Sequence, residues 1–456
     1  MATTILTGRK VMLPDSPDPR PATITISPAG KITSVLEGWR ARDPDSVQSP
    51  AIEIDAQDLV VIPGLVDAHV HLNEPGRTDW EGFWTGTRAA AAGGVTCVVD
   101  MPLNSIPPTC TVPHLDLKRT AASGQCFTDV AFWGGVIPGN QAHLRPLVEA
   151  GVKGFKCFLI DSGVEEFPCV SEADVKDAMA VLQDSSTALL FHAEFDGNPP
   201  TTSHPHPAST SYSTFLNSRP QKLETDAISL ITKLQRQYPS LRCHIVHLSA
   251  ASALPVIRAA KASGLKLTVE TCFHYLCLSA DDIPAGRPEF KCCPPIREQA
   301  NREQLWEALL DGSIDCVVSD HSPCVAELKK LDEGDIMGAW GGISTLGLGL
   351  SLLWTEGAKR GVSIARIVDW VCKKSAEHAG LGATKGELKV GYDADFVIWD
   401  PDAEYTVTKD SLQFKNKLSP YEGLTLRGQV KKTYVRGNLV YDHSSGFASV
   451  PPGRLI

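Results

Sequence analysis

Short apolar runs recur along the middle of the chain and alternate with stretches of helical periodicity. Examples of the helical stretches are Ser171–Gln183, Thr225–Gln237 and Arg302–Leu310. Strands that alternate with helices indicate βα units and a parallel sheet. About eight candidate strands occur, the number that closes a (β/α)8 barrel of the TIM type. They are Leu65–Val70, Val95–Val99, Val130–Trp133, Gly154–Leu159, Ala188–His192, Cys243–His247, Leu267–Thr271 and Asp315–Ser319.

The two ends of the chain follow a different pattern. Residues 1–60 are rich in Thr, Ile, Val and Pro, and alternating stretches such as Ala22–Ile26 are typical of short strands. Strand-like runs return after residue 388, for example at Gln429–Val435. We therefore expect a small β-sandwich domain, built from residues 1–60 and 388–456, beside a barrel of residues 61–387. The alternative is that each end of the chain folds separately.

Composition and charge narrow the class of protein. The 456 residues are 43% hydrophobic and carry a formal net charge of −10. An acidic balance argues against nucleic-acid binding, which needs basic surface, and favours a small-molecule substrate. The 13 cysteines are scattered without a CxxC pair, as in reduced cytoplasmic proteins. Because no apolar run reaches the roughly 18 residues of a membrane span and no signal-peptide pattern occurs, we expect a cytoplasmic protein without a membrane partner.

Histidines stand at the ends of several candidate strands, where barrel active sites form. His69 and His71 point to the same side of one strand, because side chains alternate along it, and two such imidazoles can bind one ion. The alternative is a pair of partly exposed histidines. His192 and His247 each end a strand, a place where a single histidine is more often structural. His244 enters its strand instead of leaving it and is the weaker candidate.

A lysine and an aspartate complete the pattern. Lys156 lies within an apolar run, where a charged ammonium is costly unless its tip reaches solvent. The alternative is a lysine carboxylated by CO₂, which requires the neutral amine that burial favours. Lys153 competes for this role but stands at the start of the run. Asp320 ends the last candidate strand, and His321 after it is expected to be structural or to support the ligands.

The ordered set of histidine pair, lysine, histidine, histidine and aspartate is much rarer than any one member, and it predicts a binuclear metal site. Zn²⁺ suits such ligands, with Co²⁺, Mn²⁺ and Fe²⁺ as alternatives. The metals would lower the pKa of a bridging water, whose hydroxide attacks an amide carbonyl while Asp320 carries the proton to the leaving nitrogen. The buried ion would take His69, His71, carboxylated Lys156 and Asp320, and the exposed ion carboxylated Lys156, His192 and His247.

These motifs resemble the amidohydrolase superfamily and, within it, the cyclic amidases, above all the allantoinases. The resemblance implies the same metal roles for the six residues, a homo-oligomer (dimer or tetramer), and hydrolysis of allantoin to allantoate in purine catabolism. The similar stretches span the whole barrel: VIPGLVDAHVHLNEPGRTDWEGFWTGTRAAAAGGVT (61–96), DMPLNSIPPT (100–109), GFKCFL (154–159), FHAE (191–194), HIVHLS (244–249), ETCFHYL (270–276), KCCPPIR (291–297) and SDHSPC (319–324).

Two positions separate the cyclic amidases from one another. Dihydroorotases typically carry an arginine, which binds the substrate carboxylate, where this chain has Asn73; allantoin has no carboxylate. Hydantoinases typically have a tyrosine soon after the lysine, and none follows Lys156 here. A hydantoinase or dihydropyrimidinase is the second hypothesis. A non-catalytic dihydropyrimidinase-like scaffold is the third, although such relatives commonly lack metal ligands that this chain retains.

Four further residues are candidates for substrate contacts. Asn104 could hydrogen-bond the ureido or imide groups, and Cys293 lies in a stretch that resembles a substrate clamp of the family. Ser322 and Trp340 are expected to line the pocket. For each of the four, a plain role in loop structure is an equal alternative.

Overall fold

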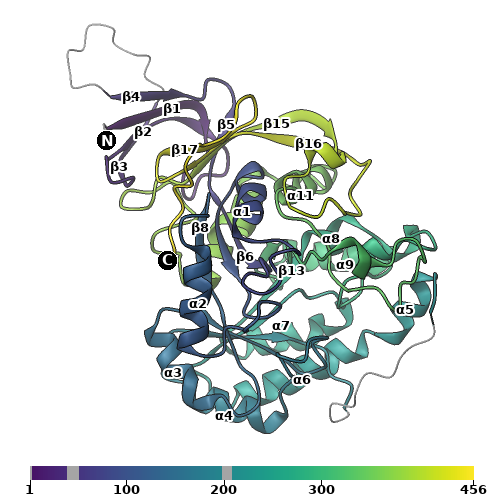
Figure 1. Cartoon of the computed structure of the whole chain (residues 1–456). Coiled ribbons are helices and arrows are strands. Elements are labelled where there is room, and N and C mark those ends of the chain that lie inside the picture. The colour runs from purple at the N-terminus through teal and green to yellow at the C-terminus, as the bar shows by residue number, and fades with distance from the viewer. Residues whose placement is uncertain (1–2, 39–50, 198–207) are drawn as a thin grey trace, which may run out of the picture.

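Parallel strands close into a barrel at the centre of the molecule (Figure 1). In this computed structural model, residues 3–38, 51–197 and 208–456 are described. One part of the barrel has the order β6-β7-β8, and the other has the order β9-β10-β11-β12-β13-β14. A parallel bridge between Val70 and His321 joins the two ends, and β8 leads into β9 through Trp133. The strands are β6 (Leu65–Val70), β7 (Val95–Asp100), β8 (Asp129–Phe132), β9 (Gly134–Gly135), β10 (Gly154–Phe158), β11 (Ala188–His192), β12 (Arg242–Ile245), β13 (Leu267–Cys272) and β14 (Cys316–Val318).

The predicted alternation of strands and helices is confirmed. Helix α4 begins where its sequence predicts, because Ser171 and Asp174 cap each other's backbone N–H groups. Helix α6 begins three residues before the predicted Thr225. The helices are α1 (Phe83–Ala92), α2 (Val112–Ala122), α3 (Gln141–Glu149), α4 (Glu172–Leu182), α5 (Tyr212–Ser218), α6 (Lys222–Gln235), α7 (Leu254–Ala262), α8 (Phe273–Cys277), α9 (Gln299–Leu310), α10 (Ala326–Lys329), α11 (Gly349–Ala358), α12 (Ile364–Val368) and α13 (Lys374–His378).

Strands from both ends of the chain meet in one nine-stranded sheet, so the two ends do not fold separately (Figure 1). Strand β5 joins them, because Val61 pairs with Val11 of β1 and with Ile398 of β15. The division at residues 60/61 and 387/388 stays a prediction, and β5 spans the first of these points. The strands are β1 (Thr4–Val11), β2 (Arg20–Ile26), β3 (Ile32–Glu37), β4 (Ile52–Asp55), β5 (Val60–Pro63), β15 (Phe396–Thr406), β16 (Thr425–Val435), β17 (Asn438–Asp442) and β18 (Gly446–Phe447).

The terminal sheet has a hydrophobic core distinct from that of the barrel. Leu6 and Ile24 from the first strands pack in one cluster with Phe396, Ile398 and Tyr434 from the last ones. The rings of Phe396 and Tyr434 stack with their centroids 4.4 Å apart. The barrel strands and the helices around them contribute the larger core. The terminal domain is therefore held together by side chains that are hundreds of residues apart in sequence.

Buried charges connect the barrel to the terminal sheet. The Lys385 ammonium lies 2.7 Å from carboxylate oxygens of both Asp129, the first residue of β8, and Asp395. Arg436, in the turn that follows Val435 in the terminal sheet, also pairs with Asp129. Removal of one partner from such a buried network leaves an uncompensated charge, which is strongly destabilising. This joint lies at the amino end of β8, away from the strand ends that carry the predicted ligands.

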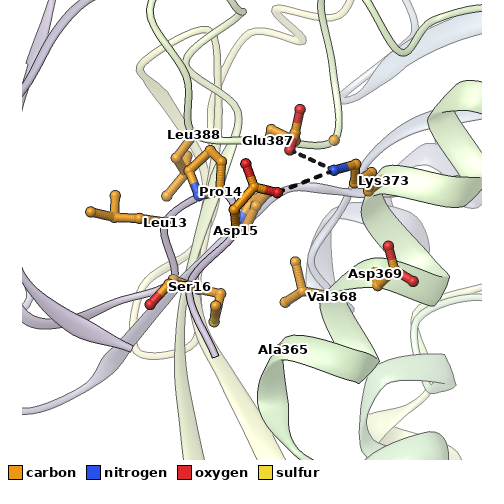
Figure 2. Close-up of a pocket in the computed structure, with 13 residues that line it drawn as sticks. Leu13, Pro14, Asp15, Ser16, Ala365, Val368, Asp369, Lys373, Glu387 and Leu388 are labelled. Atoms are coloured by element: carbon orange, nitrogen blue, oxygen red, sulfur yellow. Dashed lines mark ion pairs between the residues drawn. The ribbon is translucent and has the colours of Figure 1, made fainter. Parts of the chain in front are cut away.

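A pocket of about 150 Å³ opens beside this joint, between the segment after β1 and the residues that follow α12 (Figure 2). Figure 2 shows Lys373 pointing toward Asp15 and Glu387, with nitrogen–oxygen distances of 3.9 and 3.2 Å. Its lining includes none of the six predicted metal ligands. This pocket is therefore separate from the predicted metal ligands, which lie toward the carboxyl ends of the barrel strands.

Candidate active site

The carboxyl ends of the barrel strands bring three predicted ligands into one buried cluster. Ligand atoms of His69, His247 and Asp320 all lie within 4.8 Å of one another. His69 lies on β6, whereas His247 and Asp320 each stand two residues beyond the end of a strand. The last two have left-handed backbone, with φ of 40° and 42°. Such conformations cost about 1–3 kcal/mol outside glycine and cluster at functional sites.

Glu270 fixes the orientation of His69. Its carboxylate lies 2.5 Å from His69 Nδ1, so the ring proton stands there and Nε2 keeps its lone pair. That Nε2 atom is buried without a hydrogen-bond donor among the described residues and lies 3.2 Å from Asp320 Oδ1. His71 Nε2 approaches the same oxygen to 3.5 Å. The lone pair of His69, a ring nitrogen of His71 and a carboxylate therefore converge on one point, an arrangement that a cation would satisfy.

A second carboxylate, that of Glu194, orients His192 through its Nε2 atom, whereas Glu270 holds His69 through Nδ1. Glu194 Oε2 lies 2.7 Å from His192 Nε2, and Arg219 holds Glu194 through Nε at 2.9 Å from Oε1. The proton of His192 is thereby kept on Nε2, and the lone pair of Nδ1 faces His247 Nε2 at 3.1 Å. This pair of facing ring nitrogens suits a second cation close to the first.

The electrostatics of the cluster favour the neutral forms of His71, His192 and His247 and the ionised form of Asp320. Burial lowers the pKa of His192 to about 4, and it lowers those of His71 and His247 as well. Burial opposes ionisation of Asp320, but His69 and the hydrogen-bonded His71 outweigh it and lower the pKa of that carboxyl to about 2. Neutral imidazoles and an ionised carboxylate are the forms that bind divalent metals, so these residues fit a metal centre.

Lys156 stands among these groups on β10 and is 1% exposed. Burial lowers its pKa to about 8, against the opposing attraction of Asp320 and Glu270. The amine therefore gives up its proton more readily than an ordinary lysine does. Lys153, its competitor, is half-buried before the strand begins, and its backbone N–H donates to the carbonyl of Phe132.

Comparison with known proteins shows to which family the chain belongs. Residues 60–440 match the family model described as the amidohydrolase family. The chain belongs to the amidohydrolase family. The allantoinase of Saccharomyces cerevisiae is 48% identical and covers 96% of this chain and 95% of its own length. The mitochondrial allantoinase of Aquarana catesbeiana is 54% identical over 79% of this chain and 73% of its own length.

The solved structures agree with the family and confirm the fold. The L-hydantoinase (dihydropyrimidinase) from Arthrobacter aurescens superposes with a TM-score of 0.90 and 27% identity, covering 100% of this chain and 99% of its own. The predicted barrel with a β domain from both ends of the chain is therefore confirmed, as is the resemblance to amidohydrolases.

Two histidines of this amidohydrolase have structural partners. His244 lies on the far side of Glu270, with Nε2 3.1 Å from that carboxylate and Nδ1 2.7 Å from Thr268. His321 accepts two backbone N–H groups at Nδ1, and its Nε2 lies 3.2 Å from Glu81. These contacts agree with the weaker or supporting roles expected for both residues.

The four candidate substrate residues lie around the same strand ends. Asn104 Nδ2 is 3.3 Å from His71 Nδ1. Cys293 and Ser322 both border a pair of glycines that follows Trp340. A Cβ on Gly341 would stand 3.0 Å from Cys293 Sγ, and one on Gly342 only 2.2 Å from the Ser322 carbonyl oxygen, so this approach requires glycine. Whether the four touch substrate stays a prediction.

Sequence reasoning missed three buried residues at this site. Glu194 and Glu270 are both fully buried and orient the histidines, as described above. His274 lies within 4.8 Å of Asp320 and Cys272, and neither of its ring nitrogens has a partner among the described residues. The signal for Glu194 was present, since it stands two residues after His192 in the FHAE motif. An acid inside the apolar strand β13 could likewise have pointed to Glu270.

Proposed function

We propose that this amidohydrolase opens the ring of allantoin by hydrolysis and releases allantoate, as a step of purine catabolism. The observation that carries the proposal is the cluster of His69, His247 and Asp320, in which ring lone pairs and a carboxylate converge. Relatives named allantoinase, similar over nearly the whole chain, support the choice of substrate.

We infer two divalent ions, with zinc as the preferred metal and cobalt, manganese or iron as alternatives. When bound, the ions would polarise the substrate carbonyl and lower the pKa of a water molecule. The buried ion would be held by His69, His71 and Asp320, and the exposed ion by His192 and His247. Lys156, as a carbamate formed from CO₂, would bridge them; its burial and depressed pKa support this modification.

The chain's own residues would orient the ligands and move the proton. Ring opening adds a hydroxyl group from water to the carbonyl carbon and a proton to the ring nitrogen that leaves. Asp320 is ionised and buried beside the histidines, so one of its carboxylate oxygens can accept the proton of water and pass it to that nitrogen. Glu194 and Glu270 hold the histidine rings in place, which avoids reorganisation during the reaction.

A neutral substrate fits the loop after β6. Asn73 is buried, and its side-chain amide donates to the carbonyl of Pro323 at 3.4 Å. No cation stands at this position to bind a substrate carboxylate, which favours allantoin over dihydroorotate. The similarity in structure to an L-hydantoinase keeps hydantoin-type rings as the second candidate.

A substrate panel tests the proposal. Steady-state rates with allantoin, hydantoin, dihydrouracil and dihydroorotate should give the highest kcat/KM for allantoin. Faster turnover of dihydrouracil than of allantoin would contradict it and favour the dihydropyrimidinase hypothesis.

Location and assembly complete the proposal. The described residues contain no helix that is long and apolar enough to cross a membrane. We propose a cytoplasmic homo-oligomer, a dimer or tetramer, although one relative is named as mitochondrial. Fractionation of cells and the mass of the purified protein by light scattering test these two points.

A further inference from the structure

Two buried lysines outside the metal cluster converge on one loop, residues 337–342. Lys291 is 8% exposed, and its ammonium donates to the carbonyl oxygens of Met337 and Ala339, both at 2.7 Å. Lys329 is 3% exposed and donates to Trp340 O at 3.0 Å and to Gly342 O. Four carbonyls of one short segment are therefore held by two side chains.

Two buried ammonium groups hold this loop by its backbone carbonyls. Burial of an ammonium group is costly unless hydrogen bonds replace its water, and burial lowers the pKa of both lysines. Among the described residues, the oxygen partners of both ammonium groups are backbone carbonyls. A hydrogen bond between a charged group and a neutral partner is stronger than one between two neutral groups. The loop is thus fixed by strong contacts rather than by packing alone.

The loop includes or adjoins three of the residues that are expected to line the substrate pocket, namely Trp340, Cys293 and Ser322. Lys291 binds it a second time, because its own carbonyl accepts the N–H of Gly342 at 2.8 Å. This contact sets Gly341 against Cys293 and Gly342 against Ser322, and at Gly342 no side chain would fit. Ser322 N–H in turn donates to the carbonyl of Ile343 at 3.1 Å.

The same loop is connected to Asn104, the remaining candidate for a substrate contact, through the rings of Trp340 and Trp80. Trp340 meets Trp80 edge-on, with ring centroids 4.8 Å apart. Arg77 lies 5.0 Å over the Trp80 ring and donates to the carbonyl of Asn104 at 2.7 Å. The contacts of loop 337–342 therefore extend through Trp80 and Arg77 to the backbone of Asn104.

We propose that Lys291 and Lys329 are positioning residues that set substrate selectivity by holding loop 337–342 against the pocket. The inference rests on the proposed function, because it takes the pocket to be that of a cyclic amide. Neither lysine is among the metal ligands. Loss of a clamp should weaken binding of the larger substrate, allantoin, which carries an ureido chain, more than binding of plain hydantoin.

The test compares Lys329→Met and Lys291→Met with wild type, using allantoin and hydantoin as substrates. We expect KM for allantoin to rise at least about 10-fold while kcat changes less than about 3-fold, because uniform binding is lost. KM for hydantoin should change less than KM for allantoin. Metal content should stay at the wild-type value, and Lys329→Arg, which keeps a charged donor, should recover part of the loss.

Lys385→Met is the matched control, since Lys385 is equally buried but lies at the joint with the terminal sheet. It should lower the thermal midpoint and leave KM unchanged. If Lys329→Met and Lys291→Met are folded and metal-replete with wild-type KM for both substrates, the proposal is wrong. It is also wrong if kcat falls in parallel with metal content while KM stays unchanged, which would indicate general damage.

A variant that does not fold is replaced by Trp340→Phe, which loosens the same loop while keeping both lysines. The selectivity shift should appear there as well, and its absence would overturn the proposal. If wild type prefers hydantoin to allantoin, the proposed function fails on its own. The role of Lys291 and Lys329 is then tested by KM for the preferred substrate alone, which should rise in both Met variants.

Discussion

Replacement of Lys156 by alanine removes the group that we propose to bridge two cations as a carbamate. The structure explains why this lysine, among the lysines near the strand ends, is suited to react with CO₂. Only the neutral amine forms a carbamate, and burial lowers the pKa of Lys156 to about 8. At pH 7 about one tenth of the amine is then neutral, compared with about one in 3,000 for a lysine of pKa 10.5. Burial thus enriches the reactive form about 300-fold.

The expected loss in Lys156→Ala is at least about 100-fold in kcat/KM. Residues that only orient metal ligands already cost about 10–100-fold when replaced, and a bridging ligand should cost more. Bound metal, measured by mass spectrometry, should fall in parallel. Short-chain carboxylic acids should restore part of the activity, because they can occupy the position of the carbamate.

Lys153→Ala is the control for this experiment, since Lys153 lies on the same segment but stands half-buried before β10. It should keep wild-type turnover and metal content. In wild type, protein equilibrated with ¹³C-labelled CO₂ should show one carbamate carbon by NMR, and Lys156→Ala should lack it. An active Lys156→Ala variant with its full complement of metal would refute the reasoning.

Three further changes test other parts of the account. Asp320→Asn should lower kcat by about 100- to 10,000-fold, the usual contribution of acid–base catalysis, with circular dichroism unchanged; wild-type turnover would exclude Asp320 as the proton carrier. Glu194→Gln should weaken metal affinity about 10–100-fold, measured by competition with a chromogenic chelator, because His192 loses the carboxylate that fixes its proton; equal affinities would contradict this role. Lys385→Met should lower the free energy of unfolding by about 3–5 kcal/mol in chemical denaturation, and an unchanged midpoint would show that the carboxylates around it are stabilised otherwise.

Much of the fold follows from the sequence because buried parallel strands are continuous apolar runs. All eight candidate runs became barrel strands, and the Ser171 capping pattern located the start of α4. The start of α6 was placed too late because its first turn is polar. There Glu224 is buried by partners far along the chain, accepting the backbone N–H groups of Ser249 and Ala250 and pairing with Arg297. Tertiary contacts of this kind leave no local pattern.

The candidate site was predictable only where residue type and strand position coincide. The histidines, Lys156 and Asp320 lie on the barrel strands or within two residues of their ends, and the apolar runs reveal these strands. Glu270 contacts His69 across 201 positions of sequence, so nothing local distinguishes it from an ordinary strand residue. Lys291 lies in an irregular segment, and Lys329 is the last residue of the short helix α10, just before another irregular segment. Polar residues at such positions are normally solvated. Their burial depends on a loop path that no periodicity encodes.

Metal titration of the apoprotein tests the central claim most directly. Protein freed of metal by chelation, in buffer containing bicarbonate, is titrated with Zn²⁺ while hydrolysis of allantoin and formation of allantoate are followed. We predict no turnover without metal and a rise to a plateau at about two ions per chain, as a two-metal site requires. Full turnover in metal-free protein, or a metal-replete protein that leaves allantoin intact, would contradict the account.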